Sequence, residues 1–242
     1  MLKIVIADSY DQVSEEAFKI MRQVVEKENP VLGLATGSTP VGLYKKMIAD
    51  HKTNGTSYKN AITFNLDEYV GLPRNHEQSY YTFMHDNLFN EIDVPEENIH
   101  IPNGEAADPD AECVRYESEM AKYVVDVQVL GIGSDGHIAF NEPGAAFDSL
   151  THTMELTEQT RKDNARFFDG DIDQVPTLAI TQGLGTIMRA KKIILIATGA
   201  NKADAVYGMI KGPKTTDCPA SILQDHPDVT VILDEEAAAK IK

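Results

Sequence analysis

The chain has little that would support a disulfide scaffold, a zinc cluster or a membrane span. Its 242 residues include two cysteines, Cys113 and Cys218, which lie far apart and match no metal-binding spacing. Reduced thiols are therefore expected. No apolar run approaches the roughly 20 residues of a spanning helix. The N-terminal segment "MLKIVIADSYDQ" turns polar directly after a short apolar run, which predicts a first strand rather than a signal peptide, and a cytoplasmic location.

Basic residues are also scarce. The sequence holds 22 Lys and Arg against 38 Asp and Glu, a formal charge of −16. Nucleic acids and anionic membranes bind to basic surfaces, so neither is expected as a partner. An anionic substrate would need a local cluster of donors instead. The length and the 42% hydrophobic content fit a single globular domain, which we predict to span residues 1–242.

Short apolar segments alternate with helical patterns along the chain. Strands are predicted at 3–7, 31–35, 61–66, 126–133, 192–199 and 229–233, and helices over 11–28, from 40, over 80–89, 109–123 and 178–188, from 202 and over 234–242. Several strands are apolar on both faces, which is typical of a parallel sheet covered by helices on both sides. The prediction is an α/β fold with a doubly wound, Rossmann-like, mostly parallel sheet, whose ligands bind beyond the carboxyl ends of strands.

The first polar strand end is "TGSTP", which follows the strand at 31–35. Gly37 permits close approach of the backbone, Thr39 can cap the next helix, and Pro40 suits its first position. Hydroxyls and free N–H groups at a helix N-terminus bind phosphate. The alternative is an ordinary capped turn.

The second polar strand end carries Asp67 and Glu68. An exposed acidic turn is the commoner role of such a pair. However, apolar residues flank the pair on both sides in "NLDEYVGL". A carboxylate desolvated by such neighbours has a raised pKa and can act as a general base near neutral pH.

The third polar strand end, "GIGSDGHIAFNEPG" at 131–144, contains the glycine pattern of dinucleotide-binding loops. That pattern requires a helix directly after it, and Pro143 prevents one, so no dinucleotide is expected. Asp135, His137 and Glu142 instead place an imidazole between two carboxylates, which can fix its tautomer and support its charge. A histidine satisfied by backbone is one alternative. A metal site is a weaker one, because no second histidine has a ligand spacing.

Cations follow the fourth strand end and a neighbouring segment. Lys202 lies where a helix begins, which opposes the helix dipole unless an anion binds there; a surface lysine is the alternative. Arg161 and Arg166 add charge in "TRKDNARFF". A phosphate loop, cations, a carboxylate and an Asp/His/Glu cluster together indicate acid–base chemistry on a small phosphorylated substrate.

Five segments, "LATGSTP", "FNLDEYVGL", "GIGSDGHIAFNEPG", "TRKDNARFF" and "ATGANKADAV", resemble in order the motifs of the glucosamine-6-phosphate deaminase family. The resemblance covers essentially the whole chain. It implies a catabolic enzyme that converts glucosamine 6-phosphate and water to fructose 6-phosphate and ammonia, without a metal or organic cofactor. It also implies a mobile lid at 150–175.

The resemblance assigns roles to individual residues. Asp67 would move a proton between C2 and C1 of the opened sugar, and His137 would help to open the ring. Asp135 and Glu142 would orient His137. The substrate and its phosphate would be bound by Thr36, Gly37, Ser38, Thr39, Arg166 and Lys202.

One departure from the family bears on regulation. The longer, allosterically activated bacterial members carry a serine pair and basic residues where this sequence has Ala145, Ala146, His152 and Met154, and they continue beyond Lys242. A short, non-allosteric enzyme is therefore expected, with a monomer favoured over a hexamer.

Two other functions fit parts of the sequence. A 6-phosphogluconolactonase-type hydrolase would share the fold and phosphate loop but would not need Asp67 as a carbon base. A non-catalytic sugar-phosphate sensor would usually carry a basic DNA-binding module, for which the acidic charge is unsuited. The aromatic residues Tyr80, Tyr81 and Phe83 are expected to be the core of a helix.

Overall fold

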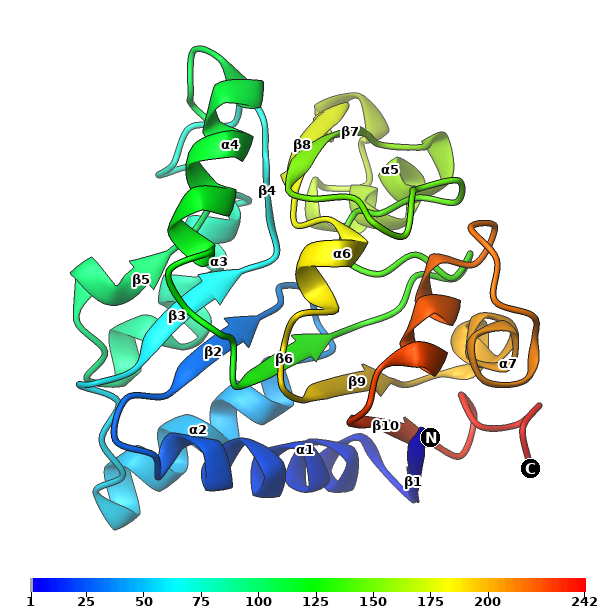
Figure 1. Ribbon diagram of the computed structural model, residues 1–242, viewed down its shortest axis with the longest axis horizontal. Helices are drawn as coiled ribbons and strands as arrows, with labels where there is room; N and C mark the ends of the chain where they lie inside the picture. The colour runs from blue at the N-terminus through cyan, green and yellow to red at the C-terminus, as the bar shows by residue number, and fades with distance from the viewer. Residues whose placement is uncertain (1) are drawn as a thin grey trace.

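The computed structural model describes residues 2–242 and contains two β-sheets (Figure 1). The larger sheet has seven parallel strands, in the order β1 (Lys3–Ala7), β10 (Val229–Asp234), β9 (Ile193–Ala197), β6 (Val127–Leu130), β2 (Val31–Leu34), β3 (Ile62–Asn65) and β5 (Ile99–His100). Figure 1 shows α1 and α2 on one side of this sheet and α4 and α6 on the other. The predicted doubly wound, mostly parallel α/β fold is confirmed.

The connections between strands are mainly helical. The α-helices are α1 (Tyr10–Val25), α2 (Val41–Asn54), α3 (Tyr80–Asn87), α4 (Pro109–Met120), α5 (Glu158–Asn164), α6 (Leu184–Ile187) and α7 (Ala203–Lys211). Short 3-10 helices are η1 (Phe89–Glu91), η2 (Glu96–Asn98), η3 (Ala165–Phe167), η4 (Ile172–Gln174), η5 (Ala200–Lys202) and η6 (Pro219–Asp225). Several begin at side-chain caps: Ser9 accepts the N–H of Gln12 in α1, and Asp108 caps α4, whose first residue is a proline.

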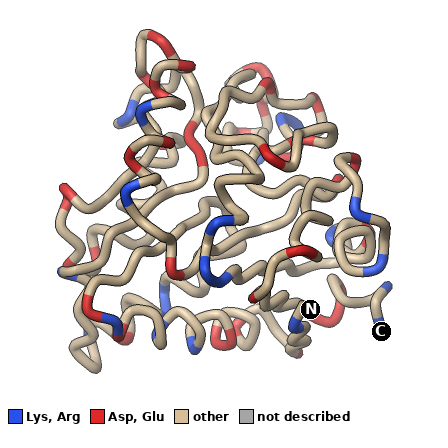
Figure 2. The backbone as a smooth tube through the Cα atoms, viewed as in Figure 1, with Lys and Arg blue, Asp and Glu red and all other residues tan. Residues whose placement is uncertain are grey.

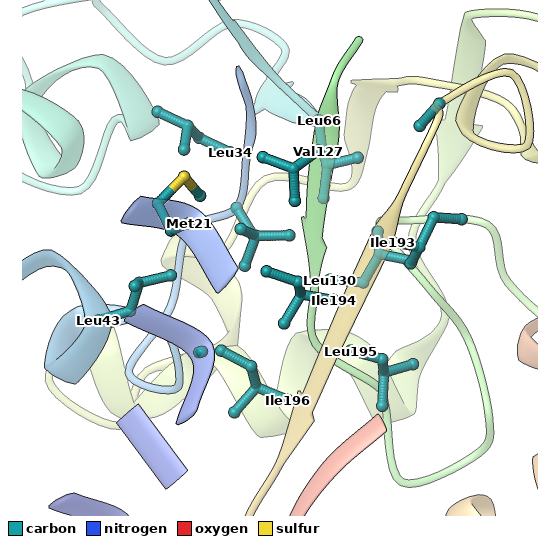
Figure 3. Packing of buried hydrophobic residues seen from close by; sticks show 14 of the residues in the cluster. Met21, Leu34, Leu43, Leu66, Val127, Leu130, Ile193, Ile194, Leu195 and Ile196 are labelled. Atoms are coloured by element: carbon teal, nitrogen blue, oxygen red, sulfur yellow. The ribbon is translucent and has the colours of Figure 1, made fainter. Parts of the chain in front are cut away.

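The core lies on both faces of the larger sheet. Strand β9 is buried along its whole length, which agrees with its uninterrupted apolar sequence. Figure 3 shows its isoleucines and leucine packed beside Val127 and Leu130 of β6, with Met21 of α1 and Leu43 of α2 close by. This packing fixes the strands whose ends carry the candidate site.

The strand order creates a switch point between β2 and β6. These two strands are neighbours, but the chain continues from β2 toward β3 and β5 on one side, and from β6 toward β9 and β10 on the other. The loops that leave their carboxyl ends therefore diverge and leave a crevice between them. The predicted phosphate loop and the histidine turn are these two loops.

A second, smaller sheet was not predicted from the sequence. It is antiparallel, in the order β4 (Asp67–Tyr69), β8 (Leu178–Thr181) and β7 (His152–Glu155). The helix predicted over 178–188 is wrong in its first part, because residues 178–181 pair with both neighbouring strands. Gly183 and Gly185 are weak helix formers, and α6 is a single turn.

The helix predicted over 234–242 is also wrong. Residues 235–241 form turns, in which Ile241 donates to the carbonyl of Ala238 and Ala239 donates to that of Glu236. The Asp234 carboxylate accepts the N–H of Ala237 at 2.7 Å, which stabilises a turn at the end of β10.

The charges are distributed over many elements. Figure 2 shows basic residues on several separate stretches of backbone, with acidic residues between them. Within residues 2–242, no helix combines the length and apolarity needed to cross a bilayer.

Candidate active site

One cavity lies beyond the carboxyl ends of the central strands and brings most of the predicted site residues together. Its lining includes Thr36, Gly37, Ser38, Thr39, Asp67, His137, Arg166 and Lys202. Asp135 and Glu142, the other two predicted site residues, lie behind the ring of His137. Arg161 is directed elsewhere: its guanidinium donates to the carbonyls of Ile172 and Val175.

The phosphate loop joins β2 to α2. Gly37 has a φ of +88°, a conformation that strains residues with a Cβ. The predicted cap is wrong, because Pro40 rather than Thr39 holds the N-cap position of α2. The hydroxyl of Thr39 is consequently not used by the helix end, and it lines the cavity.

Two tyrosines hold this loop from outside the cavity. The buried hydroxyl of Tyr44 donates to the carbonyl of Ala35 (2.5 Å) and accepts its N–H (3.1 Å). The hydroxyl of Tyr10 accepts the N–H of Gly42 and lies 2.9 Å and 3.0 Å from the carbonyls of Ser38 and Thr39. These contacts could not be predicted from the sequence, because they depend on how α1 and α2 pack beside the loop.

The cations reach the cavity from two further segments. Arg166 lies in η3, and Lys202 immediately precedes α7. Burial lowers the pKa of Lys202 and the nearby Arg166 adds to this effect, while Asp163 and Asp135 oppose it. A phosphate bound between Arg166 and Lys202 would satisfy both charges and the N–H groups of the loop.

Asp67 is buried at the start of β4 and lines the same cavity. Burial raises the pKa of its carboxyl well above the usual range, and the charge of Glu68 raises it further. The predicted desolvation is therefore present. A carboxylate with this pKa is a stronger base than an exposed one and can accept a proton from carbon.

His137 is held by the two carboxylates that flank it in the sequence. Its Nδ1 lies 2.7 Å from Oδ1 of Asp135 and 3.6 Å from Oε2 of Glu142. Burial raises the pKa of Asp135, but the hydrogen bond and charge of His137 outweigh this and lower it to about 2. Glu142 also accepts the N–H and hydroxyl of Thr157, both at 3.3 Å. With Nδ1 facing carboxylates, Nε2 is the nitrogen available to a substrate.

The glycines of this turn have a steric role. A Cβ on Gly133 would come within 2.3 Å of the His137 ring, and one on Gly136, whose φ is +91°, within 2.7 Å of the Cys218 sulfur. No helix follows, since residues 137–144 form turns and an isolated bridge. Ala139 has a φ of +53°, so the turn that presents His137 also stores backbone strain.

The same cluster satisfies the geometry of a metal site. Asp135, His137 and Glu142 each offer a ligand atom, and these atoms lie within 4.8 Å of one another. Nδ1 of His137 lies within ion-pair distance of both carboxylates, but among the described residues neither Nδ1 nor Oε2 of Glu142 has a hydrogen-bond partner. The absence of a metal requirement stays a prediction, which a chelator can test.

Aromatic residues form much of the remaining wall. Tyr80 and Phe83 pack against the buried clusters, as expected of helix core, and they also line the cavity, which was not expected. Tyr81 lies outside it, under the guanidinium of Arg74 at 3.8 Å. The spacing of Tyr80 and Phe83, three residues apart after the cap Ser79, was the signal that could have placed both on one helix face.

A segment of the predicted lid closes the cavity on another side. Asn164, at the end of α5, donates to the hydroxyl of Tyr69 in β4 at 2.9 Å. Phe168 packs edge-on against Tyr69, with ring centroids 5.9 Å apart. The lid segment is therefore tied to the strand that carries Asp67, whereas its mobility stays a prediction.

Comparisons with known proteins give consistent results. A sequence model of the glucosamine-6-phosphate isomerases and 6-phosphogluconolactonases matches residues 7–232. Glucosamine-6-phosphate deaminase from Thermoanaerobacter pseudethanolicus is 51% identical, with 99% of this chain and 95% of that protein covered. Glucosamine-6-phosphate deaminase 2 from Bacillus subtilis is 49% identical, with 100% of this chain and 98% of that protein covered.

Solved structures agree with the sequence comparisons. A monomeric glucosamine-6-phosphate deaminase superposes with a TM-score of 0.96 at 45% identity, covering 98% of this chain and 99% of that one. A 6-phosphogluconolactonase from Trypanosoma brucei superposes with a TM-score of 0.82 at 21% identity, covering 100% of this chain and 99% of that one. This likeness concerns the fold alone. The ends of the domain predicted at 1–242 lie just outside the family match.

Proposed function

This chain belongs to the family of glucosamine-6-phosphate isomerases and 6-phosphogluconolactonases, and we infer that it is a glucosamine-6-phosphate deaminase. The observation that carries this inference is the placement of the buried Asp67 carboxyl in one cavity with the phosphate loop and His137. A base of this kind beside a phosphate site is suited to a reaction that removes a proton from carbon.

The substrate phosphate binds at the carboxyl end of β2. Residues 36–39 offer N–H groups and hydroxyls, and Arg166 and Lys202 supply positive charge. The phosphate lies far from the reacting carbons of the sugar. Its binding energy therefore positions C1 and C2 between Asp67 and His137 without taking part in the chemistry.

His137 and Asp67 act in turn. The imidazole exchanges a proton at the ring oxygen and opens the pyranose to an aldehyde, with Asp135 supporting the charged form of the ring. Asp67 then takes the proton from C2 while the aldehyde oxygen gains one, which gives an enolamine. Asp67 returns its proton to C1 as the amine nitrogen loses one, which leaves an alcohol at C1 and an imine at C2. Water adds to this imine, and ammonia leaves as the C2 ketone of fructose 6-phosphate forms.

The two alternatives are less well supported by the site. A lactonase activates water against an ester and has no use for a carbon base at Asp67. A sensor needs only the phosphate loop and does not need His137 held by two carboxylates. The relatives that match nearly the whole chain at about half identity carry the deaminase name.

We also propose that the enzyme is a cytoplasmic monomer without allosteric activation, and that neither nucleic acid nor membrane is a partner. Ala145, Ala146, His152 and Met154 replace the polar and basic residues of activated members. The matched structure of 45% identity is described as monomeric. Sedimentation should give one 26.7 kDa species, and N-acetylglucosamine 6-phosphate should leave the kinetics hyperbolic and unchanged. An activated or hexameric enzyme would contradict this proposal.

The proposed activity is tested by measuring ammonia and fructose 6-phosphate released from glucosamine 6-phosphate. Purified protein is treated with a strong chelator and compared with Asp67→Asn, whose folding is checked by circular dichroism. Equal amounts of both products from the wild type alone support the deaminase and its carbon base. Activity that returns only when a divalent ion is added would show that Asp135, His137 and Glu142 bind a metal. Hydrolysis of 6-phosphogluconolactone without ammonia release would refute the deaminase.

A further inference from the structure

Glu68 lies next to Asp67 in β4 but faces the opposite way, as neighbouring residues in a strand do. Asp67 lines the active-site cavity, whereas Glu68 lines a second cavity of about 640 Å³. Glu68 is 3% exposed, and its carboxylate accepts three backbone N–H groups. Oε1 accepts those of Tyr69 (2.9 Å) and Tyr80 (3.0 Å), and Oε2 accepts that of Tyr81 (3.0 Å).

These hydrogen bonds join two elements that both contribute to the active site. Tyr80 and Tyr81 are the first residues of α3, so the carboxylate holds the N-terminus of this helix, where a negative charge is favoured. The same helix carries Tyr80 and Phe83 into the active-site cavity. The Tyr80 ring also packs against that of Tyr69, and Tyr80 shares the wall of the active-site cavity with Thr36 of the phosphate loop.

We propose that Glu68 is a positioning residue for the reaction, whose ionised carboxylate fastens α3 to β4 so that Asp67 and Tyr80 face the substrate together. This inference rests on the proposed deaminase function. It adds a residue that does not touch the substrate but decides how two residues that line its site are placed. The ionised form is required, because a protonated oxygen would direct its hydrogen at a backbone N–H.

The surroundings of Glu68 couple its charge to Asp67. Burial raises the pKa of Glu68 to about 7, against the opposing effects of the three N–H groups and of Arg74. The charged and titratable groups around it are the adjacent Asp67 on β4, Arg74 on the following loop, Tyr80 and Tyr81 on α3, and His100, Glu105, Glu112 and Arg115 across the second cavity. The charge of ionised Glu68 in turn raises the pKa of Asp67 beyond the effect of burial.

The test compares Glu68→Gln, Glu68→Asp and the control Glu112→Gln. Glu112 is a buried carboxylate on the wall of the same second cavity, and it binds Arg115 and the N–H of Asn103 instead of α3. The measurements are kcat, KM and the pH dependence of kcat/KM for ammonia release, together with the melting temperature of each protein.

Each variant has a distinct expected result. Glu68→Gln should lower kcat about tenfold, since a displaced base and wall reduce the rate steeply. It should also move the acid limb of the profile down by about one pH unit, because a like charge beside Asp67 is gone. Glu68→Asp keeps the charge but shortens the side chain, so it should restore the acid limb without restoring kcat. Glu112→Gln should leave the acid limb of the pH profile where it is in the wild type.

Failure of this inference is distinguishable from failure of the proposed function. No ammonia from the wild type would remove the deaminase itself. If the wild type is active, two results for Glu68→Gln would overturn the positioning role. One is an acid limb of the pH profile that is unchanged from the wild type, and the other is a lower melting temperature with no change in the kinetics. If Glu68→Gln does not fold, Glu68→Asp decides: its kcat must fall while its acid limb stays in place, and a wild-type kcat would refute the proposal.

Discussion

Substitution of Tyr44 by phenylalanine is expected to loosen the phosphate loop from behind. The Tyr44 hydroxyl is fully buried and forms two hydrogen bonds with Ala35, the last residue before the loop. Removal of one oxygen atom leaves the N–H and the carbonyl of Ala35 without this partner. The ring and its packing remain, so the change isolates the two hydrogen bonds.

The size of the effect follows from burial. A buried polar group left without a partner costs about 1–3 kcal/mol, so two such groups should cost about 3 kcal/mol after some relaxation. For a chain of this length, that corresponds to a melting temperature lower by about 6–12 °C. Because Ala35 directly precedes Thr36, KM for glucosamine 6-phosphate should also rise, by about tenfold.

Tyr10→Phe is the matched control. Its hydroxyl bonds to the same loop, but the residue is 41% exposed and water can replace it. Tyr10→Phe should therefore lower the free energy of unfolding by less than about 1 kcal/mol. Urea unfolding of the three proteins and steady-state kinetics give both quantities. A loss below about 1 kcal/mol for Tyr44→Phe, or equal losses for the two variants, would refute the reasoning that buried bonds to Ala35 hold the loop.

Three further substitutions test the site. Asp67→Asn should lower kcat about 10³-fold. Folding raises the pKa of the Asp67 carboxyl in the wild type, so the free energy of unfolding should fall as the pH rises above 3.8. Unfolding measured against pH should show no such fall in Asp67→Asn. Asp135→Asn should lower the free energy of unfolding by about 1 kcal/mol at neutral pH, a value that allows for the partial exposure of the side chain. The difference should vanish as pH falls from 3.8 through about 2, where the carboxyl of Asp135 is protonated, and a constant difference would contradict the shift. Arg166→Ala should raise KM at least about tenfold, unlike Arg161→Ala, whose guanidinium serves the lid backbone. Equal KM values would exclude Arg166 from phosphate binding.

The sequence was sufficient where the signal is local. Apolar runs such as 192–199 predict buried parallel strands, because a strand covered on both faces has no polar side. The polar residues that follow each run predict the site, since parallel strands end at one edge of the sheet. Pro143 excludes a helix after the glycine pattern, and the structure has none in that stretch.

Local patterns failed where competing structures are close in energy. Residues 178–181 have both helical and extended character, and only their pairing with β4 and β7 makes them a strand. The C-terminal segment has the composition of a helix but is too short to form one in isolation. Tyr80 belongs to the core as expected, but its second role on the cavity wall depends on how α3 is placed.

The sequence alone determined which chemical groups the protein carries and that strand ends would present them. Only the tertiary structure decided that β2 and β6 are neighbours, so that the phosphate loop and His137 face one cavity. It also placed Glu68 on a different cavity from Asp67, the residue that the family resemblance had assigned as the base. Strand order and cavity walls depend on contacts between residues far apart in the chain. The electrostatic environment that raises the pKa of Asp67 exists only after those residues have packed around it.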